Sequence, residues 1–289
     1  MTVATVAPGG NDAGWFRRLI LPGLAFKAVV IGGGYATGRE IAEFFVPAGP
    51  WGGIAGLALA TLVWSAVCAV TFLFARMMNA QDYQSFFQAL LGRGWIVFEL
   101  TYALFVILIL AVFGAAAGEI ASAALGVPKP VGMVGLMLGI SGIAAFGNAS
   151  VERLFAWVSV LLYGVYALFL LFALTAFGDR IGAAFAVPVN LTGPWVTGGI
   201  TYAGYNIVGA VIILPALRHL TNGRDALIAG AIAGPLAMLP ALLFFVCMIA
   251  FAPAIAGTAL PSDFLLSRLD QPGFRLLFQL MIFAALLES

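Results

Sequence analysis

The chain has 289 residues, of which 63% are hydrophobic and 9% are charged, and its formal net charge is +1. A soluble globular domain carries charge on about 25% of its residues, so this composition excludes one. The near-neutral charge gives no reason to expect a nucleic-acid partner. We expect an all-α polytopic membrane protein, embedded in a lipid bilayer as a single membrane domain over residues 1–289.

Apolar stretches of about 20 residues, the length that a membrane-crossing helix needs, recur along the chain. We expect short amphipathic helices on opposite membrane surfaces at residues 76–93 and 261–270. The last apolar stretch, about 16 residues long after Pro272, is short for a full crossing. In chain order we expect about eight spans, at residues 19–45, 51–75, 95–118, 130–147, 154–177, 195–217, 226–252 and from 274 onward.

Three consecutive glycines, Gly32, Gly33 and Gly34, interrupt the first span. Each glycine costs about 1 kcal/mol relative to alanine inside a helix, which predicts a broken helix. Backbone groups freed inside a bilayer must face protein, water or a ligand, so a break here indicates a binding site. The alternative is a glycine face for close helix packing. Polar side chains directly after the glycines favour the site: Thr37, Arg39 and Glu40.

The sixth apolar segment resembles the first. Aligning Tyr35–Ala36 with Tyr202–Ala203 also aligns Gly32 with Gly199. The sixth segment comes five spans after the first, so equivalent helices would cross the membrane in opposite directions, as they do in transporters built from inverted repeats. We therefore expect a second interruption within residues 199–206. The candidate substrate-binding residues are Gly32, Gly33, Gly34, Tyr35, Ala36, Thr37, Thr201, Tyr202, Tyr205 and Asn206.

Each part of this candidate site has a structural alternative. The hydroxyl and amide groups of the sixth segment can orient a small solute, but they can equally form hydrogen bonds between helices. Arg39 and Glu40 follow the first break on the outer side of the membrane, and Glu119 lies near the outer end of the third span. We expect these three residues to form an outer gate with an Arg39–Glu119 ion pair. The alternative is an Arg39–Glu43 pair on one helix face.

The run Gly-Gly-Gly-Tyr-Ala-Thr-Gly-Arg-Glu-Ile at residues 32–41, followed by Phe44 and Phe45, resembles the first-helix signature of YkvI-type bacterial membrane proteins. These are relatives of the amino acid–polyamine–organocation (APC) superfamily. The resemblance implies a LeuT-type fold, with ten core helices in two inverted repeats and the substrate between broken helices one and six. Repeat one would cover residues 19–177, and residues 195–289 would form a repeat two that is truncated before spans nine and ten.

The resemblance also implies that the first and eighth helices are neighbours, which often form a sodium site. Lys27 lies in the first span before the glycines, and Glu288 lies in the eighth. We expect these two residues to pair and to take part in ion coupling, with the lysine ammonium in place of sodium. The alternative is that Lys27 extends its side chain to the membrane surface.

The positions of lysine and arginine predict a cytoplasmic N-terminus. This orientation places Arg17, Arg18, Arg76, Arg93, Arg153, Arg218 and Arg224 inside, and Lys129, Arg180, Arg268 and Arg275 outside. The chain has one histidine, and its two cysteines lie within apolar runs, so we expect no enzyme activity, cofactor or metal site.

The sequence thus favours a secondary active transporter in a bacterial inner membrane. It would move a small solute by alternating access coupled to H⁺ or Na⁺. The resemblance to the superfamily implies that this solute is an amino acid or other nitrogen compound. The alternative is a non-transporting sensor or receptor subunit on the same fold.

Overall fold

The computed structural model describes residues 14–145, 148–255, 257–258 and 260–288, and helices dominate these residues. The first part of the chain forms η1 (Phe16–Ile20), α2 (Leu21–Val30), α3 (Gly33–Ala36), α4 (Arg39–Phe44), η2 (Val46–Ala48), α5 (Gly49–Met78), α6 (Tyr83–Leu91), η3 (Gly92–Gly94), α7 (Trp95–Leu125) and α8 (Lys129–Ala145). The second part forms α9 (Asn148–Phe185), α10 (Trp195–Asn206), α11 (Gly209–Ile212), η4 (Leu214–His219), α12 (Gly223–Ile249), α13 (Ala252–Ile255), α14 (Pro261–Leu266) and α15 (Pro272–Glu288).

Four stretches of the described residues are helical, long and apolar enough to cross a membrane. They are Arg39–Met78, Tyr83–Leu125, Arg153–Phe185 and Gly223–Ile249. The other expected spans consist of shorter helices, of which α8 and α15 have 17 residues each; residues 146–147, at the end of the expected fourth span, lie outside the described residues. The structure therefore supports a polytopic membrane protein, and the number of eight spans stays a prediction.

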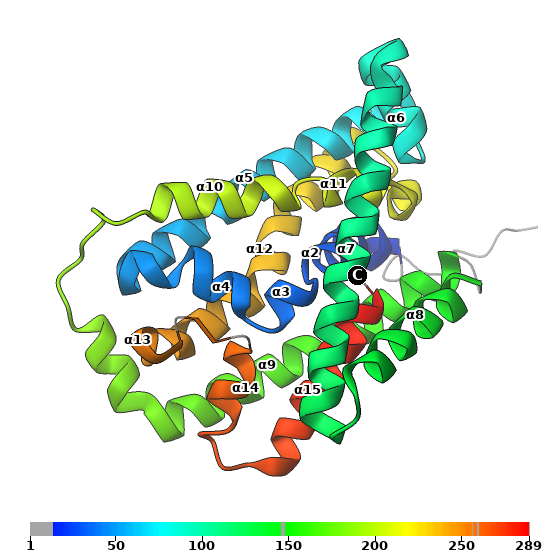
Figure 1. Ribbon diagram of the computed structural model, residues 1–289. Coiled ribbons are helices and arrows are strands. Elements are labelled where there is room, and N and C mark those ends of the chain that lie inside the picture. Colours follow the sequence, from blue (N-terminus) through cyan, green and yellow to red (C-terminus); the bar gives the residue numbers. More distant parts are fainter. Residues whose placement is uncertain (1–13, 146–147, 256, 259, 289) are drawn as a thin grey trace, which may run out of the picture.

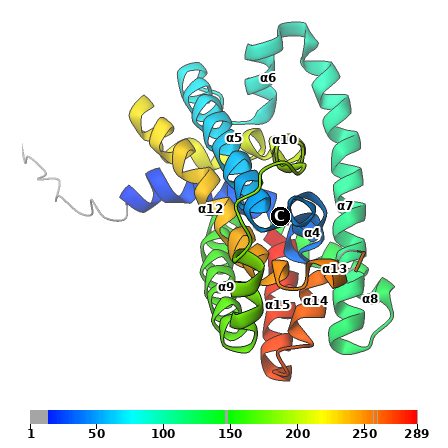
Figure 2. The ribbon, with the colours of Figure 1, turned by 90° about the vertical axis from the view of Figure 1, so that its left-hand side faces the viewer.

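Helix α12 forms the centre of the bundle and packs against α5, α2 and α9 (Figure 1). Helix α10 lies along α5, and α7 pairs with α8 and with the last helix, α15. Figure 2 shows α7 standing at one side of the bundle, with α6 at its end. The interrupted first span contacts helices on both sides of it. Helix α2 packs against α12 and α9, α4 packs against α10, and α3 packs against α7 and α15.

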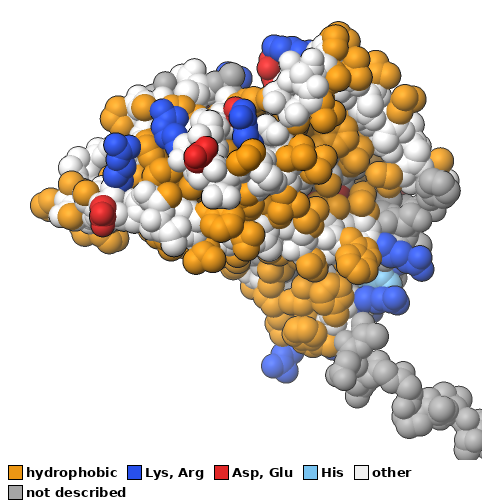
Figure 3. Space-filling model, turned by 90° about the horizontal axis from the view of Figure 1, so that it is seen from below, with side chains coloured by type: hydrophobic (Ala, Val, Ile, Leu, Met, Phe, Trp, Pro, Cys, Tyr) orange, Lys and Arg blue, Asp and Glu red, His pale blue; other side chains and the backbone are white. Residues whose placement is uncertain are grey.

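The outer surface of the bundle is strongly apolar. On α7, Leu104 and Ile107 are 70% and 66% exposed. Figure 3 shows a broad hydrophobic face with the charged side chains gathered toward its edges. Exposed apolar patches of this extent indicate contact with a membrane or a partner, and the apolar helices identify the lipid bilayer as that environment.

Two prolines interrupt the backbone hydrogen bonding of α12. Pro235 and Pro240 have no N–H, so the carbonyls four residues earlier lose their helical donors. The Ser65 hydroxyl donates to the carbonyl of Ala231 at 2.9 Å, and the Tyr163 hydroxyl donates to that of Leu236 at 2.7 Å. Hydroxyls from α5 and α9 thus satisfy both freed carbonyls, which explains how the central helix accommodates two prolines.

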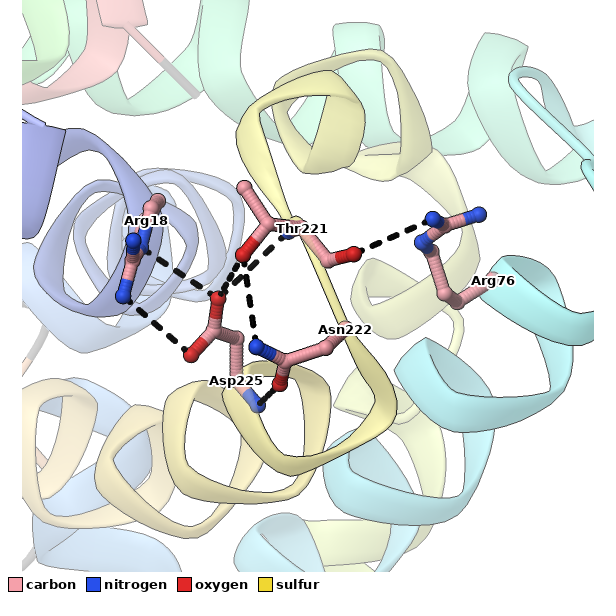
Figure 4. A network of polar contacts seen from close by, with 5 residues as sticks. All are labelled: Arg18, Arg76, Thr221, Asn222 and Asp225. Atoms are coloured by element: carbon pink, nitrogen blue, oxygen red, sulfur yellow. Dashed lines mark hydrogen bonds and ion pairs between the residues drawn. The ribbon is translucent and has the colours of Figure 1, made fainter.

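A polar network joins the start of the chain to the first turn of α12 (Figure 4). Asn222 caps this helix by accepting a hydrogen bond from the Asp225 N–H at 2.8 Å. The Asp225 carboxylate lies 3.2 Å from Nε of Arg18 and accepts a hydrogen bond from the Thr221 hydroxyl at 2.6 Å. Arg76, at the end of α5, donates to the Thr221 carbonyl at 3.2 Å. Three segments that are distant in sequence are therefore fastened together at this end of the bundle.

Candidate functional site

The first span is broken where the glycines predicted it. Helix α2 ends at Val30, and Ile31 leaves helical geometry with φ −78° and ψ 66°. Four residues of helix follow in α3, and the chain then turns through Gly38 at φ +80° before α4 begins. A residue with a side chain pays about 1–2 kcal/mol to adopt this left-handed conformation. The predicted interruption is confirmed.

Several backbone groups of the interruption have partners within the protein. The Thr37 hydroxyl donates to the Gly34 carbonyl at 3.2 Å. The N–H of Ser262, in the first turn of α14, donates to the Thr37 carbonyl at 3.0 Å. These two carbonyls were expected to be free for a substrate. In this conformation they instead hold the interrupted segment in shape and join it to α14.

Tyr35 connects the interruption to the central helix. Its hydroxyl donates to the Ala237 carbonyl and accepts from the Ala241 N–H, both at 2.7 Å. In a regular helix, residue 241 would donate directly to residue 237, so the hydroxyl is inserted into the backbone ladder of α12. This insertion lies beside Pro240. Tyr35 was predicted to bind substrate, but both hydrogen-bonding functions of its hydroxyl are used to fasten α3 to α12.

This bridge makes a stability prediction. Tyr35→Phe should destabilise the protein by about 1–2 kcal/mol, since interhelical hydrogen bonds in membranes average about 0.6 kcal/mol and reach about 1.7. Tyr202→Phe is the matched control, because the buried Tyr202 hydroxyl has no hydrogen-bond partner among the described residues. Thermal unfolding in detergent should show a lower stability for Tyr35→Phe and an unchanged stability for Tyr202→Phe. Equal shifts would contradict the bridge.

The sixth segment differs from its prediction. Helix α10 runs without a break from Trp195 to Asn206, and α11 begins at Gly209. The expected interruption within 199–206 is therefore wrong, and the irregular turn lies at residues 207–208. Gly198 and Gly199 serve close packing instead: a Cβ at each would lie 2.2 Å from the Phe44 carbonyl oxygen and 2.8 Å from that of Gly56. Thr201, also predicted to bind substrate, is exposed.

Glu40 folds back from α4 onto the interruption. A Cβ at Gly34 would lie only 2.1 Å from Glu40 Oε1, so the absence of a side chain there makes room for the carboxylate. The Tyr205 hydroxyl, on α10, lies beside this carboxylate. Glu40 Oε2 and the hydroxyls of Tyr202 and Tyr205 are buried and form no hydrogen bond of normal geometry among the described residues, although the Tyr205 hydroxyl is close enough to the carboxylate to interact with it. Such orphaned polar groups are costly, and they are the first groups that a ligand would satisfy.

Aromatic rings surround this cluster. The ring of Tyr202 lies 5.8 Å from that of Phe44, 5.0 Å from that of Phe45 and 5.3 Å from that of Trp64, centroid to centroid. The ring of Tyr205 lies 5.9 Å from that of Phe44 and 5.7 Å from that of Tyr202. The rings of Tyr202 and Tyr205 therefore pack against each other and against the rings of Phe44, Phe45 and Trp64.

A pocket of about 220 Å³ adjoins the cluster. Tyr205 and Asn206, both predicted to bind substrate, line it, and so does Phe113, whose ring occupies the space where a Cβ of Gly32 would be. The remaining lining is almost wholly apolar: Val29, Tyr102, Phe105, Val106, Ile109, Leu110, Ile140, Val208, Ile212 and Leu287. The structure thus places Tyr205 and Asn206 of the sixth segment in the wall of this pocket, and the first span contributes Val29, which lies just before the interruption.

Lys27 and Glu288 form an ion pair between α2 and α15. Both side chains are 0% exposed, so Lys27 does not extend to the membrane surface. The pair itself was predicted and is present. Oxygen Oε2 of Glu288 is buried without a hydrogen-bond partner among the described residues, so the pair leaves one acceptor unused. Its part in ion coupling stays a prediction.

The expected outer gate is not formed in this conformation. Glu119 pairs with Lys129, at the start of α8, rather than with Arg39. Arg39 is exposed on α4, and the adjacent Glu40 turns inward. Glu119 pairs with Lys129 because α7 and α8 pack against each other and bring the two side chains together. The structure places the Glu40 carboxylate beside Gly34 and Tyr205, and a gating role for Glu40 stays a prediction.

Comparisons with known proteins agree with the membrane character of the chain. No protein-family model matches it, and no solved structure matches it. The chain is 29% identical over 225 residues to a Bacillus subtilis (strain 168) protein named "Uncharacterized membrane protein YkvI". The match covers 73% of this chain and 61% of that protein, so the chain spans less than two thirds of the relative's length. The chain is therefore a multi-pass membrane protein similar to a YkvI-like family.

Proposed function

We propose that the protein is a secondary active transporter that moves a small nitrogen-containing solute across a bacterial inner membrane by alternating access. The observation that supports this most is the interruption at residues 31–38, after which the Glu40 carboxylate lies beside Tyr205, a residue that lines a pocket. Broken helices that carry polar groups into the bilayer are typical of transporter binding sites.

The proposal includes a LeuT-type arrangement of inverted repeats within the APC superfamily, with a cytoplasmic N-terminus. The interrupted first span and the turn after α10 would then be equivalent parts of the two repeats. The network around Arg18 and Asp225 would lie on the cytoplasmic side and hold it closed. Alternating access would require this network to open, because it fastens η1, which leads into α2, to the start of α12.

Ion coupling would involve Lys27 and Glu288. Ionisable residues inside a membrane are candidates for proton or ion pathways, and this pair has an unused carboxylate oxygen that could accept a proton or contact a cation. The pair joins α2, directly before the interruption, to α15. A change in the charge of this pair would therefore alter the conformation of the interruption, where the solute binds.

Uptake into liposomes containing the purified chain tests this function. Small radiolabelled amines and amino acids are offered under an imposed proton gradient, an imposed sodium gradient or neither. We expect one solute to accumulate above its external concentration only when a gradient is present. A sensor or receptor would instead bind a solute without concentrating it, and that result would contradict the transporter.

A further inference from the structure

We infer that Glu40 holds the ammonium group of the solute, and that this solute is an amine with an apolar body and no carboxylate. The inference rests on the proposed function only in treating the interruption as the solute site. The geometry that supports it is a group of buried oxygens on Glu40, Tyr202 and Tyr205, of which Tyr205 also lines an apolar pocket.

The first observation is that the carboxylate lacks a counter-charge. Ion pairs among the described residues join Arg18 to Asp225, Lys27 to Glu288, Lys129 to Glu119 and Arg275 to Asp263, and none of them includes Glu40. A buried carboxylate without a counter-charge either takes up a proton or binds a cation, because an unpaired buried charge is strongly unfavourable. The ionisable neighbours on α4 do not supply one, since Arg39 and Glu43 are both exposed. The position is therefore complementary to a cation brought by a ligand.

The second observation is the chemistry around that position. Glu40 Oε2, Tyr202 OH and Tyr205 OH can all accept hydrogen bonds, and none of the three forms a hydrogen bond of normal geometry among the described residues. A protonated amine carries only donors and would satisfy several acceptors at once. The rings of Phe44, Tyr202 and Tyr205 add their π-electrons, which attract cations within about 6 Å of a ring centroid.

The third observation concerns what the pocket lacks. Among the residues that line it there is no lysine, arginine, aspartate or glutamate. A solute carboxylate placed there would be desolvated without a partner and would also face the negative charge of Glu40. An alkyl or aryl group, by contrast, matches the side chains of Val29, Phe105, Ile109 and Phe113. The site therefore discriminates against amino acids in favour of simple amines.

Binding of three related probes to the full chain in lipid nanodiscs tests the inference. Phenethylamine carries the amine and an aryl body, N-acetylphenethylamine lacks the charge, and phenylalanine adds a carboxylate. Affinities are measured by isothermal titration calorimetry. We expect saturable binding of phenethylamine and affinities at least about tenfold weaker for the other two, a ratio that corresponds to about 1.4 kcal/mol.

Variants localise the effect. Glu40→Gln should weaken phenethylamine binding at least about tenfold, whereas Glu43→Gln, an exposed carboxylate on the same helix, should leave it unchanged. Tyr205→Phe keeps the ring and removes one acceptor, and it should weaken binding measurably. If Glu40→Gln does not fold, Tyr205→Phe tests whether the amine binds at this cluster. Equal binding to all variants, phenylalanine binding as tightly as phenethylamine, or no saturable amine binding would each overturn the inference.

The outcome is separable from the transport proposal. Amine binding that depends on Glu40, without uptake driven by a gradient, would contradict a transporter and leave the amine site standing. Conversely, driven uptake that survives Glu40→Gln and is not inhibited by phenethylamine would support a transporter and overturn the amine site.

Discussion

Replacing Lys27 with methionine is expected to destabilise the protein by about 3–5 kcal/mol. This is the usual result when one partner is removed from a buried ion pair, because the remaining charge has no compensation. Both side chains of the Lys27–Glu288 pair are fully buried, and Glu288 already has one oxygen without a hydrogen-bond partner among the described residues. Thermal and denaturant unfolding in a fixed detergent measure the effect.

Two comparisons make the result specific. Lys129→Met removes the partner of Glu119 in a pair whose side chains are 57% and 41% exposed. Exposed pairs contribute about 0–1 kcal/mol, so this variant should remain near wild type. The double variant Lys27→Met with Glu288→Leu should recover much of the lost stability, because neither charge is then left alone. Equal losses at the buried and exposed pairs would contradict a buried Lys27–Glu288 pair.

Under the proposed function, the same variants separate stability from coupling. The double variant should fold but lose the dependence of uptake on the imposed proton or sodium gradient. Lys27→Arg keeps the charge with a different shape and is the conservative comparison. Unaltered ion dependence in the double variant would remove the pair from the coupling mechanism.

Gly38→Ala is expected to cost about 2–5 kcal/mol. The left-handed backbone at φ +80° contributes about 1–2 kcal/mol for any residue with a side chain. The new methyl would also lie 2.1 Å from Cε1 of Phe244, an overlap that forces the buried ring to move, and overpacking of this kind costs about 1–3 kcal/mol. The turn that joins α3 to α4 should therefore be distorted, and Glu40 with it.

Gly126→Ala separates the two causes of this loss. Gly126 also has a positive φ, +67°, but a Cβ there would meet nothing within 4 Å. It should therefore show the backbone cost alone. If unfolding experiments gave the same loss for both variants, the close approach of Phe244 to the interruption would be contradicted.

Features that depend on local chemistry could be predicted from the sequence. The poor helix propensity of three glycines predicted the break after Val30, and the break is present. The Lys27–Glu288 pair was predicted from the resemblance, which implies that the first and eighth helices are neighbours, and the pair is present. Helix α6 is likewise present within residues 76–93 and is capped by Asp82.

Features that depend on packing between distant helices could not be predicted from the sequence. Gly198 and Gly199 suggested a second break, but inside α10 they allow close contact with Phe44 and α5. The hydroxyl of Tyr35 is used by α12, some 200 residues later, which no local pattern indicates. Pro235 and Pro240 do indicate in the sequence that α12 has polar contacts with other helices, because each proline frees a carbonyl that must find a donor in another helix. The inward turn of Glu40 follows from the sharp bend at Gly38, which helical spacing cannot anticipate.

Amide hydrogen exchange in lipid nanodiscs tests most directly whether the first span is interrupted inside the membrane. Local opening is easiest where the regular helical ladder is absent. We expect the amides of residues 32–38 to exchange at least about tenfold faster than those of residues 24–30 in α2, and to slow when phenethylamine is added. Exchange as slow at residues 32–38 as in α2 would mean an unbroken helix, and would contradict both the interruption and the site built on it.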